Sequence, residues 1–107
     1  MTITYDDFKK LHIKIGKILS AEKVPKADKL IKMEVDLGDQ KRQIVAGIAE
    51  FYKPEDLVGK QVPILANLEP RTIRGIESQG MILIADAGEK LVLMNPECEI
   101  PPGSSIE

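Results

Sequence analysis

Short runs in which apolar and polar residues alternate are the feature that most limits how this chain folds. Residues 29–38 form one such run, in which every second side chain is apolar, as with Met33 and Val35. Residues 13–19 form another, with Gly16 inside it. A period of two is that of a strand with one buried face, and glycine within a strand predicts a bulge or a sharp bend. The pattern predicts a small barrel in which one long, bent strand serves both sides.

Turn and capping residues complete the predicted order of elements. Thr4 caps a helix over residues 4–11, in which acidic residues come first and lysines last. A helical turn over residues 53–59 has a proline near its start and a glycine at its end. Further strands are predicted over residues 41–49, 60–66, 81–85 and 90–94.

Three later segments allow further predictions about burial and position. Pro63 lacks a backbone donor, so it favours an edge or bulge position for the strand over residues 60–66. The strand over residues 81–85 is wholly apolar and is expected to be buried on both faces. The tail, residues 96–107, is expected to run extended along the surface or to join a subunit contact.

The fold class predicted from this order is all-β. Five strands with a helical turn between the third and fourth are the order of the five-stranded OB-fold barrel, here with a short N-terminal helix and a C-terminal extension. The length of 107 residues suits a single domain, residues 1–107. The OB-fold binds oligonucleotides on its second and third strands and on two loops, which in this chain are residues 24–28 and 67–79.

Composition narrows the class of protein. The chain is 43% hydrophobic and 30% charged, which is typical of globular proteins. No apolar run approaches the roughly 20 residues that span a membrane, and the N-terminus has no signal pattern. We therefore expect a cytoplasmic protein with no membrane partner. The single cysteine, Cys98, excludes an internal disulfide.

No catalytic or metal-binding pattern is present, so we expect neither an enzyme nor a cofactor. His12 is the only histidine, which excludes a histidine-rich metal site. Ser78 is flanked by Glu77 and Gln79 and lacks the Gly-x-Ser-x-Gly elbow of a nucleophile. Residues 75–80 do not match the spacing of a P-loop.

The candidate binding segment is residues 67–81, which hold two arginines between two apolar runs. A segment between buried strands runs over the surface, where binding residues collect. The planar guanidinium groups of Arg71 and Arg74 suit phosphate. The formal net charge is only -2, but residues 1–53 carry eleven Lys or Arg against eight Asp or Glu, and residues 54–107 carry four against nine. A basic patch can therefore exist on an acidic protein.

Aromatic residues are absent from the expected binding face. The chain has two Phe, two Tyr and no Trp, and all four aromatic residues lie in or beside the predicted helices. Binders of single strands stack bases on aromatic side chains. Contacts to the backbone and to overall shape are therefore favoured over stacking.

Several segments resemble a known family. They are residues 27–30 (Ala-Asp-Lys-Leu), 35–38 (Val-Asp-Leu-Gly), 42–45 (Arg-Gln-Ile-Val) and above all 74–81 (Arg-Gly-Ile-Glu-Ser-Gln-Gly-Met). They are similar to the tRNA-binding domain appended to methionyl-tRNA synthetase. The same domain occurs as a free-standing structure-specific tRNA-binding protein, in secretion-chaperone-like proteins and in the endothelial monocyte-activating polypeptide. The resemblance covers nearly the whole chain.

The resemblance implies an OB-fold that binds the outer corner of tRNA with little sequence preference. It implies a homodimer formed through the terminal segments, here residues 1–11 and about 86–107. It also implies a beta subunit or trans-acting partner of the methionyl-tRNA synthetase catalytic chain, with no DNA partner expected. The RNA-facing candidates are Lys29, Lys32, Arg42, Asn67, Arg71, Arg74, Ser78 and Met81.

Each candidate has an expected role under this resemblance. The arginines would hold phosphates, and Asn67 and Ser78 would bond ribose or backbone. Met81 is equally compatible with a core position. Glu69 and Thr72 stand where many relatives have lysine, which lowers the positive charge near the site. The alternative is a dimeric chaperone-like or assembly protein that binds polypeptides or a synthetase instead of RNA, which an exposed apolar groove would favour.

Overall fold

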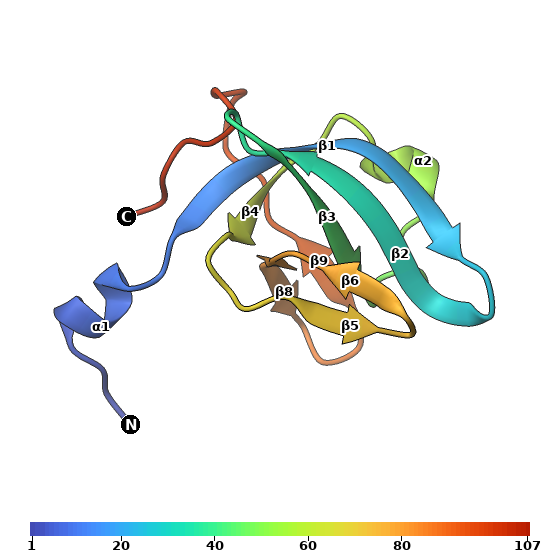
Figure 1. Cartoon of the computed structure of the whole chain (residues 1–107), viewed down its shortest axis with the longest axis horizontal. Helices are drawn as coiled ribbons and strands as arrows, with labels where there is room; N and C mark the ends of the chain where they lie inside the picture. Colours follow the sequence, from blue (N-terminus) through green and yellow to red (C-terminus); the bar gives the residue numbers. More distant parts are fainter.

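The strand β1 (Ile13–Val24) occupies the centre of the fold and pairs with strands on both of its sides. The computed structural model describes all 107 residues. Its main sheet has the strand order β3-β2-β1-β4-β7 and curls into a barrel (Figure 1). The other strands of this sheet are β2 (Ala27–Asp36), β3 (Lys41–Ala46), β4 (Gln61–Leu65) and β7 (Met81–Ile82).

Two short hairpins and two short helices complete the chain. The hairpins are β5 (Arg71–Ile73) with β6 (Ile76–Ser78), and β8 (Ile84–Asp86) with β9 (Leu91–Leu93). The helices are α1 (Tyr5–Lys9) and α2 (Pro54–Leu57), and neither has the length and apolar character needed to cross a membrane. The predicted all-β, OB-type barrel is confirmed, including the N-terminal helix and the helical turn between the third and fourth strands.

The long strand β1 divides its pairing between two neighbours. Residues 13–17 pair with β4 and residues 17–24 pair with β2, with a register shift between Ile18 and Ser20. The predicted irregularity therefore lies three residues beyond Gly16. Gly16 has a different task, because a Cβ at this position would collide with the side chain of Val35 and lie 3.1 Å from Ile64. The missing side chain lets neighbouring strands close over the core.

The C-terminal tail occupies the side of β1 that β2 leaves free. The backbone of Ile15 donates to Ser104 O at 2.8 Å and accepts from Gly103 N at 2.7 Å, and Ile106 N donates to Ile13 O. The buried side chain of Gln61 holds the same tail by accepting from Ile100 N at 3.0 Å. Of the two expectations for the tail, extension along the surface is confirmed.

The helix α1 is capped as predicted but contributes no residue to the core. Thr4 and Asp7 form a reciprocal capping box. The pKa of the Asp7 carboxyl is lowered, first by the hydrogen bond from the Thr4 backbone N–H and then by the Lys10 ammonium. No residue of α1 is buried, and Figure 1 shows the helix projecting from the barrel at the left.

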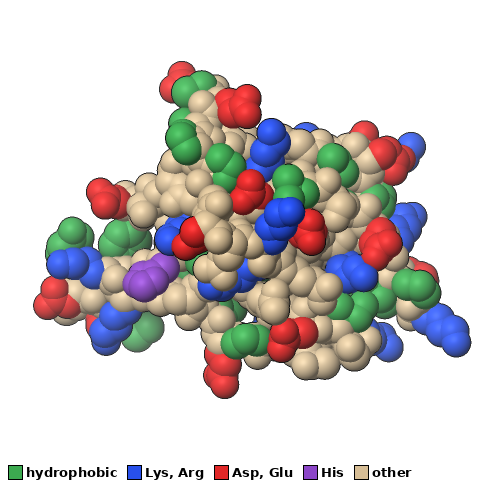
Figure 2. Space-filling model, turned by 45° about the horizontal axis from the view of Figure 1, so that its top comes forward, with side chains coloured by type: hydrophobic (Ala, Val, Ile, Leu, Met, Phe, Trp, Pro, Cys, Tyr) green, Lys and Arg blue, Asp and Glu red, His purple; other side chains and the backbone are tan.

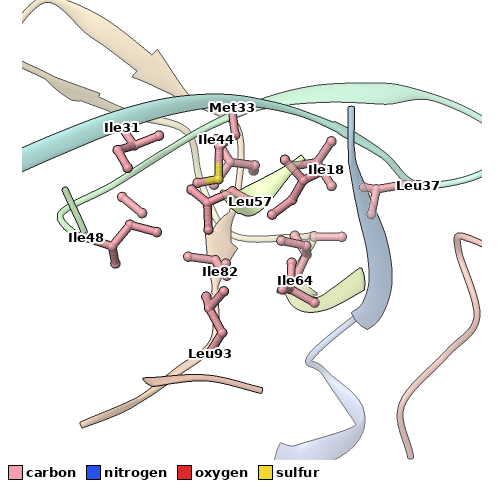
Figure 3. Close-up of a cluster of buried hydrophobic side chains, with 14 residues drawn as sticks. Ile18, Ile31, Met33, Leu37, Ile44, Ile48, Leu57, Ile64, Ile82 and Leu93 are labelled. Atoms are coloured by element: carbon pink, nitrogen blue, oxygen red, sulfur yellow. The ribbon is translucent and has the colours of Figure 1, made fainter. Parts of the chain in front are cut away.

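The core lies between the curved sheet and α2. Its largest fully buried side chains include Ile18, Ile31, Met33, Ile44 and Ile64. Leu57, the one buried residue of α2, lies within this cluster (Figure 3). A four-residue helix is marginal alone, so burial of Leu57 is what holds it in place.

Two predictions about the later strands are wrong. The run 81–85 is not buried on both faces: Met81 is 38% exposed, and only Ile82 is buried, because the strand breaks at Leu83 and its outer side is uncovered. Of the edge and bulge positions expected for Pro63, the edge position is wrong, since β4 lies between β1 and β7. The Pro63 carbonyl accepts from Leu83 N at 3.0 Å. The paired residues of β4 and β7 begin only at Ile64, so the backbone N–H that proline lacks is not required for this pairing.

We expect Gly16→Ala to lower the free energy of unfolding by about 1–3 kcal/mol, the usual cost of overfilling a packed site. Gly47→Ala is the matched control, because Gly47 has no positive φ and its nearest neighbour, Lys29 O, lies 3.9 Å from a Cβ built there. Urea unfolding of both variants measures the difference. Equal loss in the two variants would contradict the close-approach role of Gly16.

Candidate nucleic-acid interface

The hairpin β5–β6 presents Arg74 at its tip. Ile73 pairs with Ile76, and the two residues between them, Arg74 and Gly75, have φ values of 52° and 81°. Two successive positive φ angles define a type I′ turn, for which Asn-Gly is the preferred pair. The left-handed conformation costs a residue other than glycine roughly 1–2 kcal/mol. A costly conformation that is kept in a fold is a pointer to function.

Side-chain hydrogen bonds fasten this hairpin to the barrel. Gln43 N donates to Gln79 Oε1 at 3.0 Å, and Gln43 Nε2 donates to Glu77 O at 2.8 Å. Val45 N donates to Ser78 Oγ at 2.9 Å, and Gln79 N donates to Gln43 O at 2.7 Å. The edge strand β3 is thus joined to residues 77–79, which closes the barrel and fixes the hairpin.

Ser78 lies inside this closure and not at the surface. It is 4% exposed. Its hydroxyl accepts from Val45 N and donates to Gly80 O, both at 2.9 Å. The hydroxyl thus both accepts and donates a hydrogen bond within the fold. This geometry indicates that Ser78 positions the hairpin, whereas the sequence predicts a bond to ribose or backbone of the RNA.

Arg42 and Asn67 lie together at the other end of β3. The Arg42 guanidinium donates to Ala66 O and, at 3.2 Å, to Gln79 O. The Asn67 carboxamide accepts from His12 N at 2.8 Å and donates to Lys10 O at 2.7 Å, which holds the junction of α1 and β1. Both side chains border a groove of about 540 Å³. Their polar atoms are largely engaged in holding loops together.

Lys29 and Lys32 are exposed but paired with acids. Lys29 Nζ lies 3.7 Å from Glu50 Oε1, and Lys32 Nζ lies 2.8 Å from Glu22 Oε1. Lys32 also lines a shallow hollow of about 280 Å³ on the outer face of β1, β2 and β3, together with Ser20, Ala21, Glu22, Met33, Glu34 and Gln43. Figure 2 shows acidic and basic side chains interspersed over this side of the molecule. The strand face therefore has no net positive charge.

Arg71 and Arg74 are the exposed cationic candidates that form no ion pair, whereas Arg42, which also forms none, is half-buried and donates to backbone carbonyls. The four ion pairs of the structure involve Lys10, Lys17, Lys29 and Lys32. Arg71 is the first residue of the three-residue strand β5, and Arg74 follows its last residue in the turn. Met81 is also surface-exposed and pairs with Leu65 on β4, so it is not a core residue. The structure thus places Arg71, Arg74 and the buried Ser78 on one hairpin, Arg42 and Asn67 together at one groove, and the remaining candidates elsewhere.

The sequence predicts a loop over residues 67–79 and does not predict the hairpin β5–β6 that the structure contains. A signal was present, since Arg74-Gly75 is flanked by Ile73 and Ile76, and an X-Gly pair between β-branched residues is typical of a hairpin. Gln43 and Gln79 were also missed, because nothing in a sequence marks a glutamine that closes a barrel.

The class of protein follows from this geometry. An OB-type barrel that presents two exposed arginines without ion pairs on a fixed hairpin suits contact with the backbone of a nucleic acid. Residues 13–105 match the family described as "Putative tRNA binding domain", and the chain belongs to that tRNA-binding domain family.

Known proteins agree with this assignment. A methionine–tRNA ligase of Thermotoga maritima is 54% identical over 104 residues, which are 97% of this chain and 16% of the ligase. The crystal structure of a MetRS related protein from Pyrococcus horikoshii is similar with a TM-score of 0.95 and 38% identity, covering 100% of this chain and 99% of that one. The chaperone CsaA from Bacillus anthracis has a TM-score of 0.91 and 31% identity, with complete coverage of both chains. The chain therefore spans about one sixth of the ligase that it matches.

We expect Ser78→Ala to lower the free energy of unfolding by about 1–3 kcal/mol, because the buried Val45 N–H and Gly80 carbonyl lose their partner. Ser20→Ala, at an exposed serine without a side-chain hydrogen bond, should change it by less than about 0.5 kcal/mol. Thermal unfolding and hydrogen exchange of the Val45 amide measure both effects. Unchanged protection of Val45 in the Ser78 variant would contradict the closure described above.

Proposed function

We propose that this domain binds tRNA by its shape and its sugar-phosphate backbone, without reading base sequence. The observation that carries the proposal is the pair of unopposed arginines on β5–β6, a hairpin fixed to the barrel by Ser78 and Gln43. A guanidinium group suits phosphate because its donors match two oxygens at once. A rigid support reduces the entropy lost when these side chains bind.

Membership of the tRNA-binding domain family supports tRNA over other nucleic acids. The identity with a methionine–tRNA ligase supports a role beside that enzyme, either as part of a longer chain or as a beta subunit that delivers tRNA in the cytoplasm. In this role the domain contributes binding, and catalysis belongs to its partner. The RNA-facing set is Arg71, Arg74 and the exposed Met81, whereas Lys29 and Lys32 are paired with Glu50 and Glu22. The side chains of Arg42, Asn67 and Ser78 position the loops.

The proposal is tested by titrating tRNA against the wild type and the Arg71→Gln/Arg74→Asn variant at two salt concentrations. Asparagine accepts the left-handed conformation at position 74, so the turn is preserved. We expect the variant to bind about 10–100-fold more weakly, with a salt slope shallower by roughly 0.7–0.9 for each lost phosphate contact. Several unrelated tRNAs should bind alike.

Two controls sharpen this titration. Lys41→Asn removes an exposed lysine at the opposite end of β3 and should retain wild-type affinity. A plain RNA hairpin should bind more weakly than any tRNA, because it lacks the folded shape. Absence of binding to every tRNA at low salt would refute the proposed function.

We also propose that the domain forms a homodimer through its ends. An apolar groove of about 400 Å³ borders the tail, and its lining includes Ile13, Leu83, Met94 and Ile106. Met94 is 44% exposed and Ile106 37%. The projecting helix α1 exposes Tyr5 and Leu11. A second copy that brings its own terminal segments would cover these surfaces.

We expect Met94→Glu to convert the dimer to a monomer, because it places a charge in the centre of an apolar contact. Val58→Glu is the matched control, since Val58, the C-cap residue of α2, is 50% exposed and lies outside the groove. Sedimentation equilibrium measures the mass of each. A wild-type monomer at high concentration, or a dimer that persists in the Met94 variant, would contradict this interface.

A chaperone-like activity is the second candidate. The same apolar groove and the similarity to a protein described as chaperone CsaA favour it. The two functions separate by experiment: binding of an unfolded polypeptide should be lost in Met94→Glu and unaffected in the double arginine variant.

A further inference from the structure

The face of β2 and β3 is where an OB-fold usually accepts oligonucleotides. In this chain the outer face of β1, β2 and β3 holds a shallow hollow of about 280 Å³. Figure 1 shows the three strands side by side, in agreement with their pairing. The proposed binding residues Arg71 and Arg74 lie on the hairpin β5–β6 and do not line this hollow. The function proposed above therefore leaves the strand face without a role.

Glu22 on β1 neutralises the lysine of this hollow. Glu22 and Lys32 are paired residues of the β1–β2 ladder, and Lys32 Nζ lies 2.8 Å from Glu22 Oε1. The side chain of Lys32 is 37% exposed, whereas that of Glu22 is 65% exposed. A phosphate group that approaches Lys32 therefore meets a more exposed carboxylate beside a lysine that is already paired.

Glu34 adds a carboxylate that no cation on this face opposes. It is exposed and takes part in none of the four ion pairs of the structure. Its paired neighbours, Ser20 on β1 and Gln43 on β3, are both neutral. The hollow therefore holds two carboxylates against one ammonium, and its local potential repels a polyanion.

The hollow also lacks the aromatic side chains that hold unpaired bases. The uncharged residues of its lining are Ser20, Ala21, Met33 and Gln43. Proteins that bind single strands combine a positive groove with aromatic side chains on which the bases stack. A single strand on this face would gain no such stacking, and its phosphates would lie close to Glu22 and Glu34.

We propose that Glu22 and Glu34 are specificity determinants that keep single-stranded RNA off the strand face. A protein gains specificity by repelling the wrong ligand as well as by attracting the right one. A flexible single strand can follow a shallow hollow, whereas a folded tRNA contacts the hairpin β5–β6 with its backbone. This inference rests on the proposed tRNA binding and adds to it the class of RNA that the domain rejects.

The experiment titrates a tRNA transcript and a short oligouridylate, which stays single-stranded, against the wild-type chain and its Glu22→Gln and Glu34→Gln variants. We expect each substitution to strengthen binding of the oligouridylate about fivefold, the effect of one unit charge about 4 Å away in water. In Glu22→Gln the salt slope should also steepen by roughly 0.7, because the released Lys32 contacts one phosphate of the single strand. The affinity for tRNA should change by less than about twofold at physiological salt, which screens charges beyond roughly 8 Å.

Two further variants control for charge. Glu89→Gln removes an exposed carboxylate in the turn between β8 and β9 and should leave both affinities at their wild-type values. Glu22→Gln/Lys32→Gln removes both partners of the ion pair and should return the oligouridylate affinity to near the wild-type value, because no free ammonium remains. The expected effect is a gain of affinity, which a damaged fold does not produce.

Wild-type affinity for the oligouridylate in Glu22→Gln and Glu34→Gln, or an equal gain in Glu89→Gln, would overturn this inference and leave the proposed function intact. A gain of affinity for tRNA as large as that for the oligouridylate would overturn it as well, because the carboxylates would then not discriminate. Failure of the wild type to bind tRNA would refute the proposed function itself and this inference with it.

Discussion

The closure of β3 onto residues 77–79 is the interaction on which the rest of the structure depends. The sheet ends at β3 on one side and at the two-residue strand β7 on the other, and side chains bridge them. The buried hydroxyl of Ser78 serves Val45 and Gly80, while Gln43 and Gln79 exchange hydrogen bonds. Because these groups are buried or half-buried, an unmade bond would leave a desolvated polar atom, which is costly. The same bonds that close the core therefore hold the binding hairpin in place.

The placement of charged side chains in the fold matters more for binding than the net charge of the chain. The chain is acidic overall, and acids oppose the lysines of the strand face, as in the pair of Lys32 and Glu22. The unopposed cations Arg71 and Arg74 lie on a hairpin that extends beyond this face. Local potential, and not net charge, directs a polyanion. This explains how a protein of formal charge -2 belongs to a family of tRNA-binding domains.

Much of this architecture was predictable from alternation and turn residues. The period of two in β2, the Thr4 cap and the proline at the start of α2 are local signals, and the structure follows them. Three features were not predictable because they depend on tertiary contacts. Gly16 makes room for Val35, Met81 faces outward because its neighbour Ile82 faces the core, and the Ser78 hydroxyl bonds β3. A serine in a turn-rich segment is expected to lie at the surface and to bind a ligand, because the sequence does not reveal which strand packs beside it.

Mapping of backbone amide shifts by NMR during a tRNA titration tests the central claim most directly. The account expects the largest changes in residues 71–78 and small changes along the apolar groove at Ile13 and Ile106. Changes concentrated in that groove, or spread along the strand face of Glu22 and Glu34 with the hairpin unaffected, would contradict it.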